Sequence, residues 1–374
     1  MTGPFSYPAL RTIYFNITNR CNLKCRHCWI DAKFGATSSG LQASSGELTV
    51  SDVKKPIREA IGLGLTSIKF TGGEPFIRKE LPDFIRYFST LDLEIYFETN
   101  GTLVDEAVVS GLPKKNVIDI AVSIDSSDRA QHDAVRGVSG SFDKAMRGIE
   151  LLVRHDLPVQ IIYSLYACNL SKLWEAIELA RQKGARSFKI NPVISLGRAK
   201  KIDKGDLLSI EELLDLERQL EEKTYGDIDV FLDIPAAFKS TQHFLRRKKA
   251  NCCSVTSMLG ILSDGTVSIC GIGVAEEGLV MGNIKRDSLR DIWSSNDILK
   301  RIRSSIPSKL EGVCGRCIHK NFCLGCCIAQ NYAGSKRLEA PYHFCEAADK
   351  QGLFPETRLM RFEGSNEAVL AQRC

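Results

Sequence analysis

Short apolar runs alternate with longer amphipathic stretches over the first half of the chain. The runs are rich in β-branched and aromatic residues, and they lie at 13–18, 67–71, 94–99, 118–124, 159–165 and 187–193. Helix-length segments separate them, which predicts repeated strand-helix units around a parallel sheet. Because such crossovers are right-handed, we expect an α/β fold with a curved open sheet or partial barrel. Its chemistry then belongs at the carboxyl ends of the strands.

The pattern changes after the sixth predicted strand. Residues 210–223 have the amphipathic spacing of a further helix, and the chain beyond Cys252 is rich in cysteine and turn residues. This change predicts a first domain over residues 1–240, which holds the partial barrel and bridging helices. The second domain is predicted over residues 241–374, where the cysteine-rich segment ends in a C-terminal tail.

Composition and charge narrow the class of protein. The chain has 374 residues, of which 44% are hydrophobic and 25% are charged, as in soluble globular proteins. The net charge of +5 is small, and the basic run at 246–249 is interpreted as a solvated helix face, so we predict no nucleic-acid partner. No apolar run approaches the roughly 18–20 residues of a membrane span, and the first residues lack a signal-peptide core. We therefore expect a cytoplasmic protein without membrane association.

Cysteine carries the strongest chemical signal. Fourteen cysteines in a chain without a secretion signal favour metal ligation over a disulfide framework. Cys21, Cys25 and Cys28 follow the first predicted strand with the spacing C-x3-C-x2-C. Three thiolates on one loop suit an iron-sulfur cluster and leave one of four irons open for a ligand. A structural zinc site fits poorly, because such sites pair C-x2-C units and close four ligands.

On this cysteine triplet, with the aromatic His27 before its last cysteine, the chain resembles the radical S-adenosylmethionine (SAM) enzymes. The resemblance implies a (βα)6 partial TIM barrel, in agreement with the periodicity. It also implies a [4Fe-4S] cluster whose open iron binds SAM. Reductive cleavage of SAM then yields methionine and a 5'-deoxyadenosyl radical that takes hydrogen from the substrate.

Polar motifs follow the other predicted strands. The family resemblance places GGEP (72–75) at the amino group of SAM, and it places polar residues of the next strands and Arg198 at the ribose and carboxylate. In isolation these residues are equally typical of turns and caps. The predicted SAM contacts are Gly72, Gly73, Glu74, Pro75, Thr99, Asn100, Ser123 and Arg198.

Several further residues have open or structural assignments. Arg136, in the run HDAVRG, either binds a carboxylate of SAM or substrate or lies on a helix surface. His132 is expected to be structural. Cys168 and Cys374 lie outside both cysteine patterns and are expected to be a buried thiol and a tail residue. No catalytic residue is assigned.

The C-terminal cysteines resemble the SPASM extension of radical SAM enzymes. Cys270 ends a G-x4-C motif, and C-x2-C-x5-C-x3-C and a last cysteine follow. The resemblance implies two auxiliary [4Fe-4S] clusters, hence three clusters in all. The first takes Cys252 or Cys253 with Cys270 and Cys327, and the second takes Cys314, Cys317, Cys323 and Cys345.

Details of the auxiliary sites stay open. The doublets Cys252/Cys253 and Cys326/Cys327 leave the ligating cysteine undecided, and with it an open iron in the first cluster. Read without the family, the cysteines at 314–326 are also typical of a zinc ribbon.

The resemblance implies a ribosomally made peptide or protein as substrate, with a separate leader-recognition protein or recognition by the SPASM region. An electron donor such as flavodoxin or ferredoxin is the expected second partner. Sulfatase maturation is disfavoured, because that branch has an acidic residue where this chain has Gly271. The alternative substrate is a tetrapyrrole of the alternative haem or haem d1 pathways. A non-catalytic electron carrier is the third hypothesis, and the GGEP motif counts against it.

Overall fold

The computed structural model describes residues 7–30, 32–34, 46–246, 254–273 and 276–360. The chain divides into two compact units, which are described separately. The first comprises Met1–Asp233 and Ser254–Arg303, and the second comprises Ile234–Cys253 and Ser304–Cys374.

A ten-stranded sheet organises the first unit, in the order β12-β11-β10-β1-β4-β5-β6-β7-β8-β9. Six central strands run parallel and coincide with the six runs predicted from the sequence, which confirms that prediction. They are β1 (Thr12–Asn16), β4 (Ser67–Thr71), β5 (Glu94–Thr99), β6 (Val117–Ser123), β7 (Val159–Leu165) and β8 (Ser187–Pro192).

The sheet is wider than the sequence pattern predicts. β9 (Asp229–Leu232) extends one edge parallel to β8, and β10 (Met258–Ile261) pairs parallel with β1 at the other. β11 (Thr266–Ser268) and β12 (Val280–Asn283) continue from β10 as antiparallel strands. These runs have three or four residues, too short for periodicity to distinguish from turns. A two-stranded parallel sheet joins β2 (Arg20–Cys21) to β3 (Lys33–Phe34).

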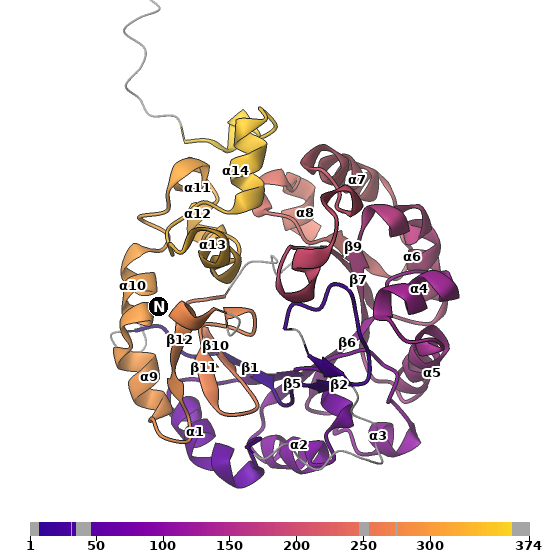
Figure 1. Ribbon diagram of the computed structural model, residues 1–374, viewed down its shortest axis with the longest axis vertical. Coiled ribbons are helices and arrows are strands. Elements are labelled where there is room, and N and C mark those ends of the chain that lie inside the picture. Colours follow the sequence, from indigo (N-terminus) through magenta and orange to yellow (C-terminus); the bar gives the residue numbers. More distant parts are fainter. Residues whose placement is uncertain (1–6, 31, 35–45, 247–253, 274–275, 361–374) are drawn as a thin grey trace, which may run out of the picture. The chain divides into compact units, whose positions relative to one another are not determined.

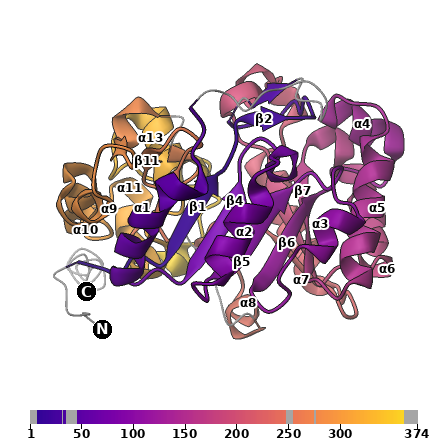
Figure 2. The same cartoon turned by 90° about the horizontal axis from the view of Figure 1, so that it is seen from below.

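Helices connect successive strands and cover the outside of the sheet, as Figures 1 and 2 show. The helices of the first unit are α1 (Val50–Gly62), α2 (Leu81–Ser89), α3 (Glu106–Ser110), α4 (Arg129–Arg136), α5 (Ser141–Arg154), α6 (Leu173–Gln182), α7 (Ile210–Glu222) and α9 (Leu289–Ser295). α10 (Asp297–Ser305) runs to the start of the second unit. α7 is the helix predicted at 210–223, and the capping box between Ser209 and Glu212 starts it.

Alternation along the strands builds the core between the sheet and its helices. Ile13 and Phe15 of β1 are buried, and they lie beside Ile68 and Phe70 of β4 in the parallel register. Phe70 stacks on Phe97 of β5 with ring centroids 5.3 Å apart. The opposite face of these strands carries polar side chains such as Lys69 of β4 and Glu98 of β5.

The second unit is a small helical body. It contains α8 (Thr241–Arg246), α11 (Gly312–Arg316), α12 (Lys320–Cys323), α13 (Ile328–Ser335) and α14 (His343–Lys350). Phe238 packs edge-on against Phe344 and Phe354, with centroids 5.1 and 5.4 Å away.

The compact units divide the chain differently from a single boundary near residue 240. Residues 254–303 return to the first unit because β10 pairs with β1. The extent of the functional domains at 1–240 and 241–374 stays a prediction. No helix in the described part of the chain is both long and apolar enough to cross a membrane.

Candidate functional site

The first cysteine triplet lies on the loop after β1. Cys21 and Cys25 are buried and Cys28 is half-buried, and the three pack in one cluster with Leu23 and Ala32. Burial raises the pKa of the Cys21 thiol to about 12 and raises that of Cys25 as well. Thiols in such a setting carry a proton until a metal replaces it. Three sulfur ligands gathered on one loop fit the predicted iron-sulfur cluster.

Arg198, in the segment after β8, binds this loop through three hydrogen bonds. Its backbone amide donates to Cys28 O at 2.9 Å, its Nε to Cys25 O at 3.0 Å, and its Nη1 to Ala32 O at 3.2 Å. Gly197 permits the approach, because a Cβ there would lie 2.4 Å from Cys28 O. Arg198 therefore organises the cysteine loop, and its predicted contact with the carboxylate of SAM stays a prediction.

The GGEP loop after β4 lies directly against the start of the cysteine loop. Gly73 N donates to Thr18 O and Glu74 N donates to Arg20 O, both at 2.8 Å. A Cβ on Gly73 would lie only 2.0 Å from Arg20 O, and Gly72 has a φ of 138°. Glycine is required at both positions by this backbone contact. Pro75 then begins the short 3-10 helix η1 (Pro75–Ile77).

Glu74 is fully buried and joins two strand ends. Its carboxylate accepts from Thr99 Oγ1 at 2.7 Å, from Asn100 N at 2.8 Å and from Phe76 N at 3.2 Å. Burial raises its pKa to about 7, which these hydrogen bonds oppose. Glu74 thus fixes the loops after β4 and β5 to each other.

An amide pair continues the network to the cysteine loop. Asn100 Nδ2 donates to Asn22 Oδ1 at 2.9 Å, and Asn22 Nδ2 donates to Thr102 Oγ1 at 2.8 Å. Ser123 is the half-buried last residue of β6. The structure therefore brings the GGEP loop, Thr99 and Asn100 together with the cysteine loop, as the motif order after each strand predicts.

Arg136 lies in the interior, which excludes its assignment to a helix surface. Its Nε is 2.7 Å from Asp125 Oδ2, its Nη2 donates to Asp125 Oδ1 at 2.9 Å, and its Nη1 lies 3.6 Å from Cys25 Sγ. Sequence reasoning missed Asp125 as a site residue, although it lies two residues after the end of β6, where parallel strands commonly present functional side chains. His132 is buried and accepts from Asp125 N at 3.2 Å, in keeping with a structural role.

In the second unit, four cysteines line one cavity. Cys314 belongs to α11, Cys317 follows it, Cys323 ends α12 and Cys345 belongs to α14. Apolar side chains, among them Leu310 and Phe354, complete the lining. These four are the set predicted for the second auxiliary cluster.

Hydrogen bonds to sulfur characterise this cysteine set. Tyr342 N donates to Cys314 Sγ at 3.3 Å, and His319 N donates to Cys317 Sγ at 3.4 Å. A hydrogen bond with Cys326 lowers the pKa of Cys323 to about 7, and one with Cys345 lowers the pKa of Cys314. The lowered pKa values favour the thiolate form of Cys323 and Cys314, which is the form that binds metal.

The cysteines predicted for the first auxiliary cluster are distributed over both units. Cys270 is buried in the first unit and accepts from Gly273 N at 3.3 Å. Cys327 is half-buried in the second unit, directly before α13. Cys252 and Cys253 lie outside the described residues, as does Cys374.

Cys168 corrects a prediction. It is exposed, whereas the sequence analysis expected a buried thiol. It lies in the 3-10 turn η2 (Ala167–Lys172) beyond the end of β7, where Ala167 and Cys168 are exposed and the next residue, Asn169, is buried.

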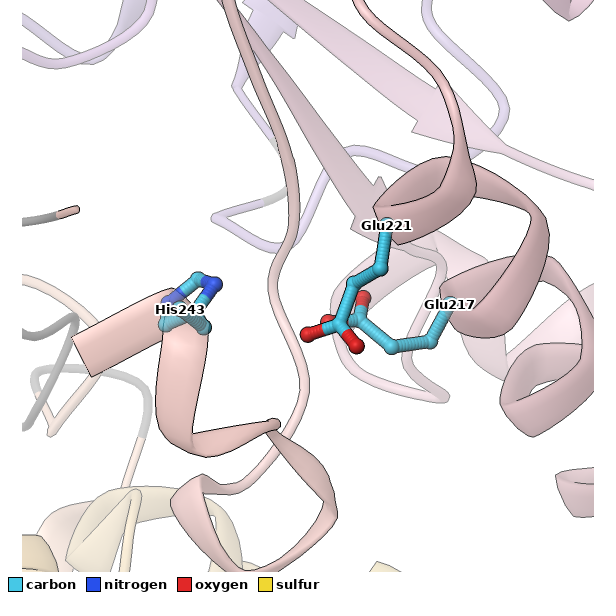
Figure 3. A group of neighbouring side chains, drawn as sticks. All are labelled: Glu217, Glu221 and His243. Carbon is cyan, nitrogen blue, oxygen red and sulfur yellow. The ribbon is translucent and has the colours of Figure 1, made fainter. Parts of the chain in front are cut away.

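Two carboxylates outside the predicted sites lie together on α7. Glu217 and Glu221 are one turn apart, and their carboxylate oxygens are within 4.8 Å of each other (Figure 3). Figure 3 also labels His243, which belongs to α8 of the second unit. Neither residue belongs to the cysteine or GGEP motifs, and the pair has no part in the proposed site.

Comparison with known families identifies the architecture. The model of the radical SAM superfamily matches residues 15–180, and the model of the SPASM iron-sulfur cluster-binding domain matches residues 252–318. The chain is a radical SAM enzyme with a SPASM domain. This confirms the resemblance read from the cysteine motifs. Both domains imply iron-sulfur clusters, and the first implies SAM, while the count of three clusters stays a prediction.

Similar proteins of this enzyme class act on different substrates. The chain is 29% identical to the AdoMet-dependent heme synthase of Methanosarcina barkeri, over 89% of this chain and 96% of that protein. It is 27% identical to the subtilosin biosynthesis protein AlbA of Bacillus subtilis, over 87% of this chain and 69% of AlbA.

A solved structure of similar fold is SuiB of Streptococcus suis bound to precursor peptide SuiA. Its TM-score is 0.70 at 17% identity, and the match covers 91% of this radical SAM enzyme and 76% of SuiB. The match confirms the α/β fold predicted from the sequence.

Proposed function

We propose that this radical SAM enzyme cleaves SAM reductively and uses the resulting radical to take hydrogen from an organic substrate. The observation that carries the proposal is the contact of the GGEP loop with the cysteine loop, which gathers both motifs at the carboxyl ends of β1 and β4. A [4Fe-4S] cluster supplies, when bound, the electron that cleaves SAM.

Different residues of the first unit are proposed to hold the cluster and to bind SAM. Cys21, Cys25 and Cys28 are the three cluster ligands, and three thiolates leave one position for SAM. The GGEP backbone, Thr99, Asn100, Ser123 and Arg198 are the proposed SAM contacts. Glu74 holds these loops together through its three hydrogen bonds, so its contribution to SAM binding is positional.

The remaining cysteines are proposed as ligands of two auxiliary [4Fe-4S] clusters. The cavity of the second unit supports Cys314, Cys317, Cys323 and Cys345 as one complete ligand set. Cys270 and Cys327, with Cys252 or Cys253, are the proposed ligands of the other. A total of three clusters follows.

A tetrapyrrole is the substrate class that the relatives favour. The match to the heme synthase spans nearly all of both chains, whereas 69% of AlbA is matched. The net charge of +5 agrees with an anionic substrate but adds little weight.

A peptide is the second candidate, supported by AlbA and by the fold shared with SuiB. A leader-recognition protein belongs to this second candidate as a partner. A flavodoxin or ferredoxin is the proposed electron donor with either substrate. Genomic neighbourhood separates the candidates, since a short open reading frame beside the gene favours the peptide and haem-pathway genes favour the tetrapyrrole.

The test is anaerobic reconstitution followed by assay of 5'-deoxyadenosine with SAM and dithionite. About twelve irons per chain with product supports three clusters and radical chemistry. About four irons with product restricts the clusters to the first unit. Full iron without product supports the electron carrier instead. Carboxylated tetrapyrroles and candidate peptides are then added in parallel, and mass spectrometry identifies which is modified.

Glu74→Ala tests the organisation of the SAM site separately. We expect weaker SAM binding, because the loops after β4 and β5 lose their shared acceptor. Glu178→Ala is the matched control, since Glu178 pairs with Arg181 on the exposed face of α6. Unchanged SAM affinity in Glu74→Ala contradicts the proposed role of the GGEP loop.

A further inference from the structure

A buried ion pair lies directly behind Cys25. Asp125 is fully buried, and the side chain of Arg136 is 6% exposed. Arg136 Nη2 donates to Asp125 Oδ1 at 2.9 Å, and Arg136 Nε forms a close ion-pair contact with Asp125 Oδ2 at 2.7 Å. The third nitrogen, Nη1, lies 3.6 Å from Cys25 Sγ, within hydrogen-bond range for sulfur. The guanidinium thus joins a carboxylate to a predicted cluster ligand.

The position of Asp125 is fixed independently of Arg136. Asp125 Oδ1 also accepts from Ser164 N at 3.1 Å. Its backbone amide donates to His132 Nδ1 at 3.2 Å, and its carbonyl accepts from Asn169 Nδ2 at 2.8 Å. The carboxylate therefore stays in place when the arginine is replaced.

Backbone contacts set the distance between Arg136 and the cysteine loop. Lys24 N donates to Arg136 O at 2.9 Å, and Arg26 N donates to Val135 O at 3.0 Å. The amides on both sides of Cys25 thus bind the last carbonyls of α4. Gly137 ends the helix with a φ of 71°, and a Cβ there would lie 2.9 Å from Lys24 O, which makes the contact specific for glycine.

We propose that Arg136 and Asp125 together tune the reduction potential of the SAM-binding cluster through Cys25. This inference rests on the proposed function, in which Cys25 is an iron-bound thiolate. A hydrogen bond and a positive charge at a ligating sulfur stabilise the more negative, reduced cluster and raise its potential. The charge of Asp125 offsets that of Arg136, so the two residues act in opposite directions. Both are positioning residues, since they act on the cluster through its ligand.

The opposite signs give a test that a merely structural role does not reproduce. The potential is measured by redox titration of the reconstituted enzyme, followed by electron paramagnetic resonance. The signal that changes on adding SAM identifies the relevant cluster. Arg136→Met is expected to shift the potential to more negative values, because the donor and the charge are removed. Asp125→Asn is expected to shift it to more positive values, because the arginine charge is no longer offset.

Two further variants act as controls. Arg26→Met removes a cation from the same loop, but Arg26 is half exposed and paired with Asp206 at 3.2 Å, so the potential is expected to stay unchanged. Arg136→Lys keeps the charge without the fork and is expected to have a smaller negative shift than Arg136→Met. It also serves as the test variant if the methionine protein does not fold.

The outcomes separate this inference from the proposed function. Unchanged potentials in Arg136→Met, or shifts of the same sign in Arg136→Met and Asp125→Asn, overturn the tuning role. If Arg136→Lys is the variant used, a potential equal to that of the wild type overturns it. A SAM-responsive signal that survives in Cys25→Ala instead refutes the ligand assignment on which the proposed function depends.

Discussion

The cysteine loop of the first unit and the cysteine set of the second are positioned by different means. Cys21, Cys25 and Cys28 lie on one loop that other parts of the barrel hold in place, chiefly through backbone carbonyls bound by Arg198 and the GGEP loop. Cys314, Cys323 and Cys345 belong to three short helices, Cys317 directly follows the first of them, and all four line one cavity. Three thiols on one loop, held in place by other segments of the barrel, suit a cluster that keeps one position free for another ligand. Four thiols around a cavity suit a cluster closed by the protein.

The hydrogen bonds to sulfur differ in the same way. The second unit supplies neutral backbone amides, from Tyr342 to Cys314 and from His319 to Cys317. The first unit adds a buried cation, Arg136, at Cys25. The comparison indicates that the two sites have distinct electrostatics, and four predictions test it, beginning with the largest expected effect.

Cys28→Ala is expected to abolish formation of 5'-deoxyadenosine. Two thiolates on the loop no longer hold the SAM-binding cluster, so iron content falls by about four per chain. The cysteines of the second unit keep their iron, because they form a separate set. Iron analysis and the deoxyadenosine assay measure both effects, and full SAM cleavage in this variant refutes the assignment of the triplet.

Cys317→Ala is expected to produce the complementary loss. Iron again falls by about four per chain, while SAM cleavage without substrate persists and substrate turnover is impaired. Cys168→Ala is the matched control, since Cys168 is exposed and outside both patterns. Iron content equal to that of the control contradicts the proposed ligand set of the second unit.

Gly73→Ala is expected to separate the two loops of the first unit. Its Cβ would lie 2.0 Å from Arg20 O, so backbone must move, at a cost of about 1–3 kcal/mol typical of overpacking. SAM affinity and thermal stability are both expected to fall. Gly334→Ala on α13 is the control, because a Cβ there meets nothing within 4 Å. Equal behaviour of the two variants shows that the loop contact is dispensable.

The smallest expected effect concerns pH. Burial lowers the pKa of His132 to about 4, with the nearby charge of Arg136 adding to the shift. Below pH about 6.5, His132 therefore binds a proton in the unfolded chain but not in the folded one. Folding stability is lost as the pH falls from about 6.5 to about 4. His132→Gln is expected to lose less stability over this interval than the wild type. Thermal melts across the interval measure the difference, and parallel curves contradict it.

Local sequence determined much of this protein. Runs such as SIKFT and VQIIYSL, with their β-branched and aromatic residues and helix-length spacers, are enough to predict the central strands. Metal ligation needs particular residue types at particular spacings, so the two cysteine patterns identified the chemistry and the two domains. The GGEP motif could be interpreted as a SAM-binding loop only because it follows a strand, and the same periodicity predicted that strand.

Tertiary structure decided the rest, because those features depend on partners far away in the chain. β10 exists as a strand of the first unit through pairing with β1, some 245 residues earlier, as in Thr12 opposite Met258. The sequence is equally compatible with Arg136 as a carboxylate partner and as a helix-surface residue. Only its burial against Asp125 and Cys25 decides between these positions and suggests an electrostatic role. The contacts of Arg198 were likewise not predictable from the sequence, because the carbonyls it binds become its neighbours only when the barrel forms.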